Sequence, residues 1–193
     1  TGVDVATAGG ASADFSVFIT VQVISTEKGI LKVVRKITRE KGMEITGRKM
    51  INEEGKEVLL SSGQMETIAL TARRFNNSKV VVEKNNVGVT LIQELQKNNV
   101  SVDEFITTMS SKDNMIRYLW SELNNKNLIL PADNTPELRE LKKELLNFGV
   151  KRLRSGREKM QALSGHDDAV IALAIANIAA RDYLRTNMVL CQD

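Results

Sequence analysis

Gly2-Val3-Asp4-Val5-Ala6 is the first of three apolar segments that decide the fold of this chain. Gly9 and Gly10 mark a turn after it. The run from Phe15 to Ile24 then alternates apolar and polar residues, which is the pattern of a strand with one buried face. A third extended run covers Ile30 to Ile37. The turns between these runs predict a meander of three antiparallel strands.

Helical and extended segments alternate after the meander. Helical spacing covers Gln64 to Phe75, Val87 to Leu95, Asn114 to Leu123, Thr135 to Phe148 and His166 to Thr186, and extended pieces cover Lys79 to Glu83, Phe105 to Met109 and Leu128 to Pro131. The segment Val150 to Leu163 predicts a basic hairpin with its turn at Ser155-Gly156. This order predicts an α/β fold with a mixed sheet, in which functional sites gather at strand ends and helix starts.

The composition fits one domain. The 193 residues are 42% hydrophobic, and we expect the domain to span residues 1–186, with a tail at 187–193. No apolar run approaches the ~20 residues that span a bilayer, and the first residues lack the pattern of a signal peptide. Cys191 is the sole cysteine, which excludes an internal disulfide and fits a reducing compartment.

Acidic residues stand within or next to three apolar segments. Asp4 interrupts the first predicted strand, Glu83 closes the run Val80-Val81-Val82, and Asp167-Asp168 precede the apolar helix. Each has an ordinary explanation: a solvent-facing strand residue, a strand-ending charge and a helix N-cap. Their joint occurrence, in this order, on two strands and a helix start favours one shared site instead.

A carboxylate beside a hydrophobic core costs free energy unless a cation pairs with it, and a bound metal ion is a common partner. Carboxylate oxygens suit Mg²⁺ or Mn²⁺. Two such ions ~3.5–4 Å apart generate a hydroxide and stabilise the entering and leaving oxygens of a phosphodiester. The pattern therefore predicts two-metal phosphodiester hydrolysis, with Asp4 as the acid that bridges the ions.

A basic cluster precedes the last acidic pair. Its five cations are Lys151, Arg152, Arg154, Arg157 and Lys159, with one anion among them. Such a cluster either contacts phosphates or is an ordinary solvated hairpin. The net charge of the chain is only +3, so the chain as a whole is not strongly basic. We therefore predict that DNA binds to this local basic cluster.

Four sets of segments carry a family resemblance. They are Gly2 to Ala6 with Gly9-Gly10 and Asp14-Phe15-Ser16-Val17, then Val82 to Gly88, Lys112 to Pro131, and Gly165-His166-Asp167-Asp168-Ala169 with its apolar helix. With these motifs, which cover nearly the whole chain, the sequence resembles the C-terminal nuclease domain of the large terminase subunit of tailed bacteriophages. The resemblance implies an RNase H-like fold, shared with RuvC-type resolvases and retroviral integrases, with helices on both faces of a mixed sheet.

By this resemblance Asp4, Glu83 and Asp168 are the catalytic acids and metal ligands, and Asp167 is a further ligand or the helix cap. The implied cofactors are two Mg²⁺ or Mn²⁺ ions. The implied reaction is the cutting of concatemeric double-stranded viral DNA during genome packaging.

Two nearby residues are auxiliary candidates. Asp14, on the strand beside Asp4, assists the acids or is only a turn residue. His166 is the single histidine, and it is a proton shuttle or supporting group, or simply a residue at the helix start.

A complete large terminase also carries an ATPase domain, whereas no Gly-x4-Gly-Lys-Ser/Thr phosphate loop occurs here. We therefore expect a nuclease domain, excised or naturally separate, without a motor of its own. The resemblance implies the terminase ATPase domain, the small terminase subunit and the portal as partners. It also implies no membrane association and a location in the host-cell cytoplasm.

Two other functions fit the same pattern. One is a structure-selective resolvase of the same fold, which would prefer four-way junctions to linear duplex. The other is a non-catalytic module that docks DNA or a protein partner and binds no divalent metal. A sugar-kinase or actin-like ATPase also begins with a Gly-x-Asp strand, but 193 residues are too few for its paired domains.

Overall fold

The computed structural model describes residues 1–6, 15–27, 29–152 and 158–189. A six-stranded mixed sheet lies at its centre, in the order β7-β6-β1-β2-β3-β8. The strands are β1 (Gly2–Asp4), β2 (Phe15–Thr26), β3 (Gly29–Lys41), β6 (Val80–Glu83), β7 (Val102–Phe105) and β8 (Leu128–Ile129). β2 runs antiparallel to β1 and β3, whereas β6 is parallel to β1 and β7, and β8 is parallel to β3. The predicted meander and mixed sheet are confirmed.

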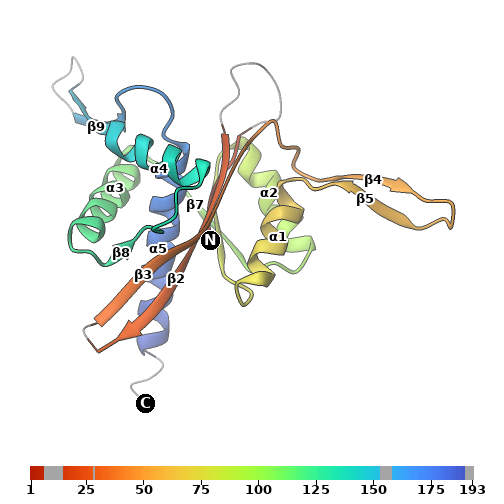
Figure 1. Ribbon diagram of the computed structural model, residues 1–193, viewed down its shortest axis with the longest axis horizontal. Helices are drawn as coiled ribbons and strands as arrows, with labels where there is room; N and C mark the ends of the chain where they lie inside the picture. The colour runs from red at the N-terminus through yellow and green to blue at the C-terminus, as the bar shows by residue number, and fades with distance from the viewer. Residues whose placement is uncertain (7–14, 28, 153–157, 190–193) are drawn as a thin grey trace.

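Helices cover both faces of the sheet (Figure 1). One face carries α1 (Gln64–Arg74) and α2 (Asn86–Lys97), and the other carries α3 (Met109–Asn124), α4 (Pro136–Asn147) and α5 (Asp168–Val189). Successive residues of a strand point to opposite faces, so each strand contributes to both cores. Val3 and Val82 pack with α1 and α2, whereas Val17 and Val81 pack with the three helices opposite.

α5 lies against the centre of the sheet. Every residue from Ala169 to Ala176 is buried, on all sides of the helix. Contacts with β1, β2, α3 and α4 explain this pattern, because a helix with one side in water would carry a polar stripe there. Within the described ranges, none of the helices has both the length and the hydropathy needed to cross a membrane.

The contact between β1 and α5 requires a glycine at position 2. A Cβ atom on Gly2 would lie 2.3 Å from the carbonyl oxygen of Ala172 and 2.3 Å from the amide nitrogen of Ala176. Both atoms belong to the backbone of a buried, close-packed helix, so they cannot easily move aside. Gly2 therefore sets the distance between α5 and the strand that carries Asp4.

Replacing Gly2 with valine should push α5 away from β1 and destabilise the domain by about 3 kcal/mol, as over-packing of a core does. Urea denaturation followed by circular dichroism would measure the loss. Leu70→Ala is the control, because Leu70 is exposed on α1 and its truncation should change the free energy of unfolding by less than about 0.5 kcal/mol. Equal stability of the Gly2→Val variant and the parent would contradict this packing.

A buried ion pair joins β3 to two helices. Lys32 is 2% exposed, and its Nζ atom pairs with a carboxylate oxygen of Glu122 on α3. The same atom donates hydrogen bonds to Asn177 Oδ1 on α5 (2.6 Å) and to the hydroxyl of Tyr118 (3.0 Å). Removing one partner of such a pair leaves an uncompensated buried charge, at a cost of about 3–5 kcal/mol. The cluster therefore anchors the middle of α5, more than two turns from Asp168.

Two parts of the chain differ from the prediction. The strand after α2 is not Phe105 to Met109 but β7, because Val102 pairs with Val80 on β6 and α3 already begins at Met109 behind its N-cap Thr108. The prediction places no element between the meander and α1. A two-stranded hairpin projects there, formed by β4 (Arg48–Ile51) and β5 (Glu57–Ser61) (Figure 1). Both strands are exposed along their length, so they lack the alternation that marks a half-buried strand.

The strand pair of the predicted hairpin is confirmed, whereas its predicted turn at Ser155-Gly156 lies outside the described residues. β9 (Phe148–Arg152) follows α4 directly and pairs in antiparallel fashion with β10 (Glu158–Ala162). The last helix begins at Asp168 and continues to Val189.

Candidate active site

Parallel pairing of β1 with β6 brings the first two acidic residues together. Gly2 pairs with Val81 and Val3 with Val82, so the next step of the same register places Asp4 beside Glu83. Both acids are the last residues of their strands. A side-chain hydrogen bond with Glu83 is one of the causes that raise the pKa of Asp4.

Two buried or partly buried amides hold the backbone that follows Asp4. The side chain of Asn85 donates to the carbonyl oxygen of Val5 (3.1 Å), and that of Gln64 donates to the carbonyl oxygen of Ala6 (3.2 Å). Gln64 is fully buried at the start of α1. These hydrogen bonds come from the starts of two helices on the same face of the sheet, and they fix the path of the backbone that leaves β1.

A tight connection after Glu83 orients the second acid. Asn85 caps α2, because its Oδ1 atom accepts a hydrogen bond from the amide of Gly88 at 2.8 Å. A Cβ atom on Gly88 would lie 2.0 Å from the carbonyl oxygen of Glu83. Glycine therefore lets α2 begin close to the end of β6. Asn85 contacts both strand exits and couples the positions of Asp4 and Glu83.

α5 supplies the third acid. Asp168 is its first residue and is 8% exposed. The Oδ2 atom of Asp168 accepts a hydrogen bond from the backbone amide of Phe15 (3.1 Å) and lies 3.7 Å from Nδ1 of His166. The rings of Phe15 and His166 meet edge to face, with centroids 5.4 Å apart. Because Phe15 begins β2, the neighbour of β1, this bond holds Asp168 near the strand end that carries Asp4.

The two adjacent acids Asp167 and Asp168 have different partners. Asp167 Oδ2 accepts from Lys112 Nζ on α3 at 3.0 Å, whereas Asp168 faces β2. The side chain of Asp168 is also the less exposed of the two, and its charge raises the pKa of Asp4 more than the charge of Asp167 does. The geometry directs Asp168 towards β2 and the end of β1, and leaves Asp167 beside a cation on α3.

The carboxyl of Asp4 is at the electrostatic centre of the group. Removal from water raises the pKa of Asp4 well above its usual value, and the charge of Glu83 and the hydrogen bond to it raise this pKa further. The charges of Asp168 and then Asp167 add to the same effect. The charges of three further carboxyl groups, one on a strand and two at the start of a helix, therefore act together on Asp4.

The chemistry of these groups fits a divalent cation. Hard ions such as Mg²⁺ and Mn²⁺ prefer carboxylate oxygens, and a cation among these acids would relieve the repulsion that raises the pKa of Asp4. In the part of the chain that the structure describes, no three His, Cys, Asp or Glu side chains already form a metal-ligand group. Asp168 accepts from Phe15 through Oδ2 and Asp167 accepts from Lys112 through Oδ2, and a carboxylate that accepts one hydrogen bond can still coordinate an ion.

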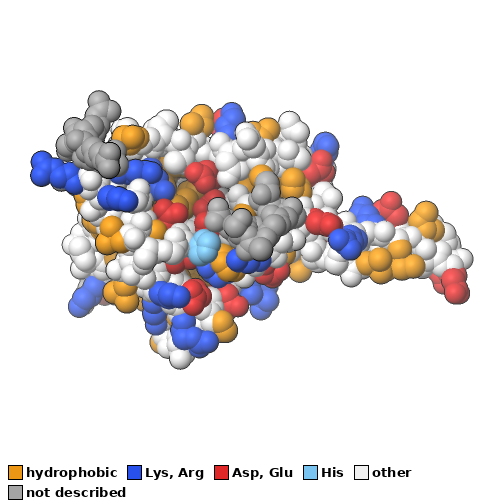
Figure 2. Space-filling model, turned by 90° about the horizontal axis from the view of Figure 1, so that it is seen from above, with side chains coloured by type: hydrophobic (Ala, Val, Ile, Leu, Met, Phe, Trp, Pro, Cys, Tyr) orange, Lys and Arg blue, Asp and Glu red, His pale blue; other side chains and the backbone are white. Residues whose placement is uncertain are grey.

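The remaining predicted site residues divide into two groups. Asp14, Arg154 and Arg157 lie outside the described residues, and Lys151, Arg152 and Lys159 are exposed on β9 and β10. Figure 2 shows acidic side chains near the middle of this end of the molecule. Lys and Arg side chains gather towards the side that bears β9, opposite the projecting β4–β5 hairpin.

Glu144 and Lys112 contact the start of α5 but are absent from the predicted site. Glu144 Oε2 accepts hydrogen bonds from the backbone amides of Ala169 (2.8 Å) and Val170 (3.4 Å). Charged residues on amphipathic helices usually face solvent, so the sequence pattern does not mark either residue as part of a site. A weak signal does exist at Glu144, because helical spacing puts it three residues after the buried Leu141, on the stripe that faces the core.

No protein-family model and no curated protein sequence matches the chain. Solved structures do match. The large terminase nuclease of thermophilic phage G20c with bound magnesium gives a TM-score of 0.68 at 21% identity, over 92% of this chain and 78% of that one. The large terminase nuclease domain of Thermus phage P74-26 gives a TM-score of 0.61 at 21% identity, over 91% and 75%.

The chain has the fold of a large terminase nuclease. A second structure of the G20c nuclease, with bound cobalt, agrees with a TM-score of 0.61 at 20% identity, over 84% of this chain and 81% of that one. At this level of identity the likeness is one of fold. The RNase H-like fold expected from the sequence is thus confirmed.

Asp4→Asn should stabilise the metal-free domain. The raised pKa of Asp4 means that the folded protein holds a proton there which the unfolded chain releases, so the parent loses stability as the pH rises through the folded pKa. Asparagine keeps a donor towards Glu83 and does not ionise. In EDTA, the melting temperature of the variant should exceed that of the parent by several degrees at pH 8, and by less at pH 4.

Circular dichroism during thermal denaturation would measure this difference. Asp103→Asn is the control, since Asp103 is exposed on β7 and pairs with Lys79. The control should show no gain that grows with pH. An Asp4→Asn variant that is no more stable than the parent at pH 8 would contradict the electrostatic strain at this site.

Proposed function

We propose that the chain is a metal-dependent endonuclease that cuts concatemeric viral DNA during genome packaging. The observation that carries the proposal is the convergence of Asp4, Glu83 and Asp168, with Asp167 beside them, on a terminase nuclease fold. The magnesium and cobalt bound in the G20c nuclease structures support a divalent ion as cofactor.

In this proposal Asp4, Glu83 and Asp168 would hold two Mg²⁺ or Mn²⁺ ions, which would activate water as the nucleophile and offset the charge that develops on the phosphate. Asp4 is the central acid, because Glu83, Asp168 and Asp167 all act on its pKa. The protein contributes geometry: the ends of β1 and β6 hold two acids, and the amide of Phe15 orients the third.

The proposed substrate is double-stranded DNA. Lys151, Arg152 and Lys159 are exposed on the β9–β10 hairpin, whose second strand leads directly to α5 and its acidic residues. Cations in such a position contact phosphates and give affinity that falls with salt. As the family resemblance implies, the proposal includes a terminase ATPase, a small terminase subunit and a portal as partners in the host-cell cytoplasm.

Asp4→Asn, Glu83→Gln and Asp168→Asn should each lower the rate of plasmid cleavage by more than about 100-fold, because each removes a charge from the shared ion site. Supercoiled plasmid is incubated with the domain and Mn²⁺ or Mg²⁺, and the nicked and linear products are followed over time on agarose gels. Excess EDTA should stop cleavage by the parent.

The matched control is Asp113→Asn, which neutralises a partly exposed acid on α3 next to Lys112 and should leave the rate unchanged. Parent-like cleavage by any of the three site variants would refute its assignment. Faster cleavage of four-way junctions than of linear duplex would favour a resolvase. Calorimetry that detects no Mn²⁺ binding would favour a non-catalytic docking module.

Neutralising the basic hairpin should weaken DNA binding in a way that depends on salt. In a variant with Arg152, Arg154 and Arg157 all changed to glutamine, the slope of log affinity against log salt should fall by about 2 to 3, since each phosphate contact contributes about 0.9. Fluorescence anisotropy of a labelled duplex, titrated over about 50 to 200 mM salt, measures the slope.

The other hairpin supplies a control with the same loss of charge. Arg48, Lys49 and Lys56 lie on or between β4 and β5, and each pairs with a glutamate. Changing these three to glutamine should leave the slope as in the parent. An unchanged slope in the β9–β10 variant would show that its cations serve another purpose, such as solubility.

A further inference from the structure

The amides at the start of α5 are capped by a residue of another helix. The first turn of a helix has backbone N–H groups without partners inside the helix, and the side chain just before the helix usually accepts from them. Here Glu144 of α4 takes that place, with Oε2 at 2.8 Å from the amide of Ala169 and 3.4 Å from that of Val170. Glu144 is only 5% exposed, so these contacts form away from water.

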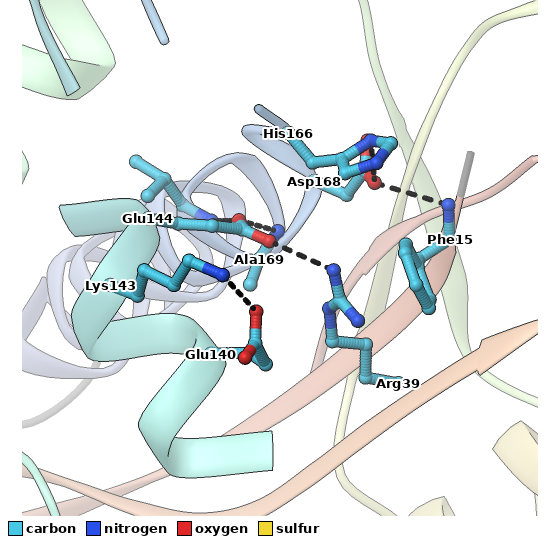
Figure 3. A network of polar contacts seen from close by, with 9 residues as sticks. Phe15, Arg39, Glu140, Lys143, Glu144, His166, Asp168 and Ala169 are labelled. Atoms are coloured by element: carbon cyan, nitrogen blue, oxygen red, sulfur yellow. Dashed lines mark hydrogen bonds and ion pairs between the residues drawn. The ribbon is translucent and has the colours of Figure 1, made fainter. Parts of the chain in front are cut away.

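The other carboxylate oxygen of Glu144 contacts a residue of the sheet. Oε1 accepts from Nη2 of Arg39 on β3 at 3.4 Å, and the guanidinium carbon of Arg39 lies 3.2 Å from the ring centre of Phe15. The amide of Phe15 in turn donates to Asp168. Figure 3 shows this closed circuit, which runs from α4 to α5, on to β2 and β3, and back to α4.

The circuit has a direct consequence for Asp168. An aspartate at a helix start ordinarily bonds to the amides of its own first turn, and its negative charge is favoured there by the helix dipole. Glu144 satisfies those amides and also places a negative charge at the same helix end. The carboxylate of Asp168 is instead directed to the amide of Phe15, beside β1.

We propose that Glu144 and Arg39 are positioning residues for Asp168. Glu144 caps α5 in place of the adjacent aspartates, and Arg39 holds both Glu144 and the strand end that Asp168 contacts. Glu144 is not itself a metal ligand, because its two oxygens already accept from Arg39 and from the α5 amides. The inference rests on the proposed function only in taking the acids as a divalent-metal site.

Glu144→Gln tests the proposal. The amide has one acceptor oxygen and one NH2 group, so it can face the α5 amides or Arg39 correctly, but not both. The turn that carries Asp168 should loosen, and Mn²⁺ should bind about 10-fold more weakly, as when a group that orients a metal ligand is lost. Calorimetry with Mn²⁺ alone measures this affinity without any DNA or catalysis.

Glu122→Gln is the matched control. It breaks the other buried pair between a cation of β3 and a helix glutamate, Lys32 with Glu122, which holds α5 at Asn177 instead of at its start. This variant should lose thermal stability, yet bind Mn²⁺ within about 2-fold of the parent, because losing a supporting side chain weakens metal binding only through the ligand that it orients, and Glu122 orients none of the acids. Metal affinity therefore distinguishes positioning from a general structural role.

Amide hydrogen exchange gives a second measure. In Glu144→Gln the amides of Ala169 and Val170 should exchange at least tenfold faster than in the parent, while the amides around Asn177 keep their protection. Arg39→Met should weaken Mn²⁺ binding less, and the double variant should resemble Glu144→Gln alone, since residues of one network do not act additively. Should Glu144→Gln fail to fold, Arg39→Met carries the same test, because it leaves the cap of α5 in place.

The outcomes separate the two proposals. Parent-like Mn²⁺ affinity in folded Glu144→Gln, or in Arg39→Met if only that variant folds, overturns the positioning role and leaves the nuclease untouched. A parent that binds Mn²⁺ but cleaves no DNA overturns the nuclease and leaves the positioning role intact. A parent that binds no Mn²⁺ overturns both.

Discussion

Mutual repulsion among carboxyl groups at one edge of the sheet is the constraint on which the rest of this structure depends. Asp4 lies where burial, Glu83 and the acids of α5 all oppose its ionisation. Like charges in a medium of low dielectric constant repel strongly, so an ordinary core would not retain this group. Apolar packing on both faces of the sheet keeps the acids together. A divalent cation bound among them would replace the repulsion between the carboxylates by attraction.

Close backbone approach is the means by which the fold meets this constraint. Gly2 lets α5 lie against β1, and Gly88 lets α2 begin against the carbonyl group of Glu83. Asn85 bonds to both strand exits, and Glu144 reaches across from α4 to cap α5. Each contact removes freedom from one acid, so the site is held by helices and strands rather than by the loops around it.

The two hairpins both carry several cations but differ in how those cations are paired and where the hairpins lie. Those of the β4–β5 hairpin each pair with a glutamate, and that hairpin projects away from the central sheet (Figure 1). The described cations of β9 and β10 lie on the strand pair that leads into α5. Charge counts along the chain do not separate these cases, because the pairing of charges is a property of the folded surface.

Local patterns by themselves determined the meander, the alternation that follows it, the basic hairpin and the three acidic positions, because side-chain periodicity and turn residues act over a few neighbouring positions. The β4–β5 hairpin was not predicted, because exposed strands show no alternation of apolar and polar residues. The predicted position of β7 was wrong, because parallel pairing with β6 sets where this strand begins and ends. Only the tertiary structure decided which of Asp167 and Asp168 faces β2, and that Glu144 caps α5. Those contacts join residues far apart in the chain, where no local spacing reports which partner is within reach.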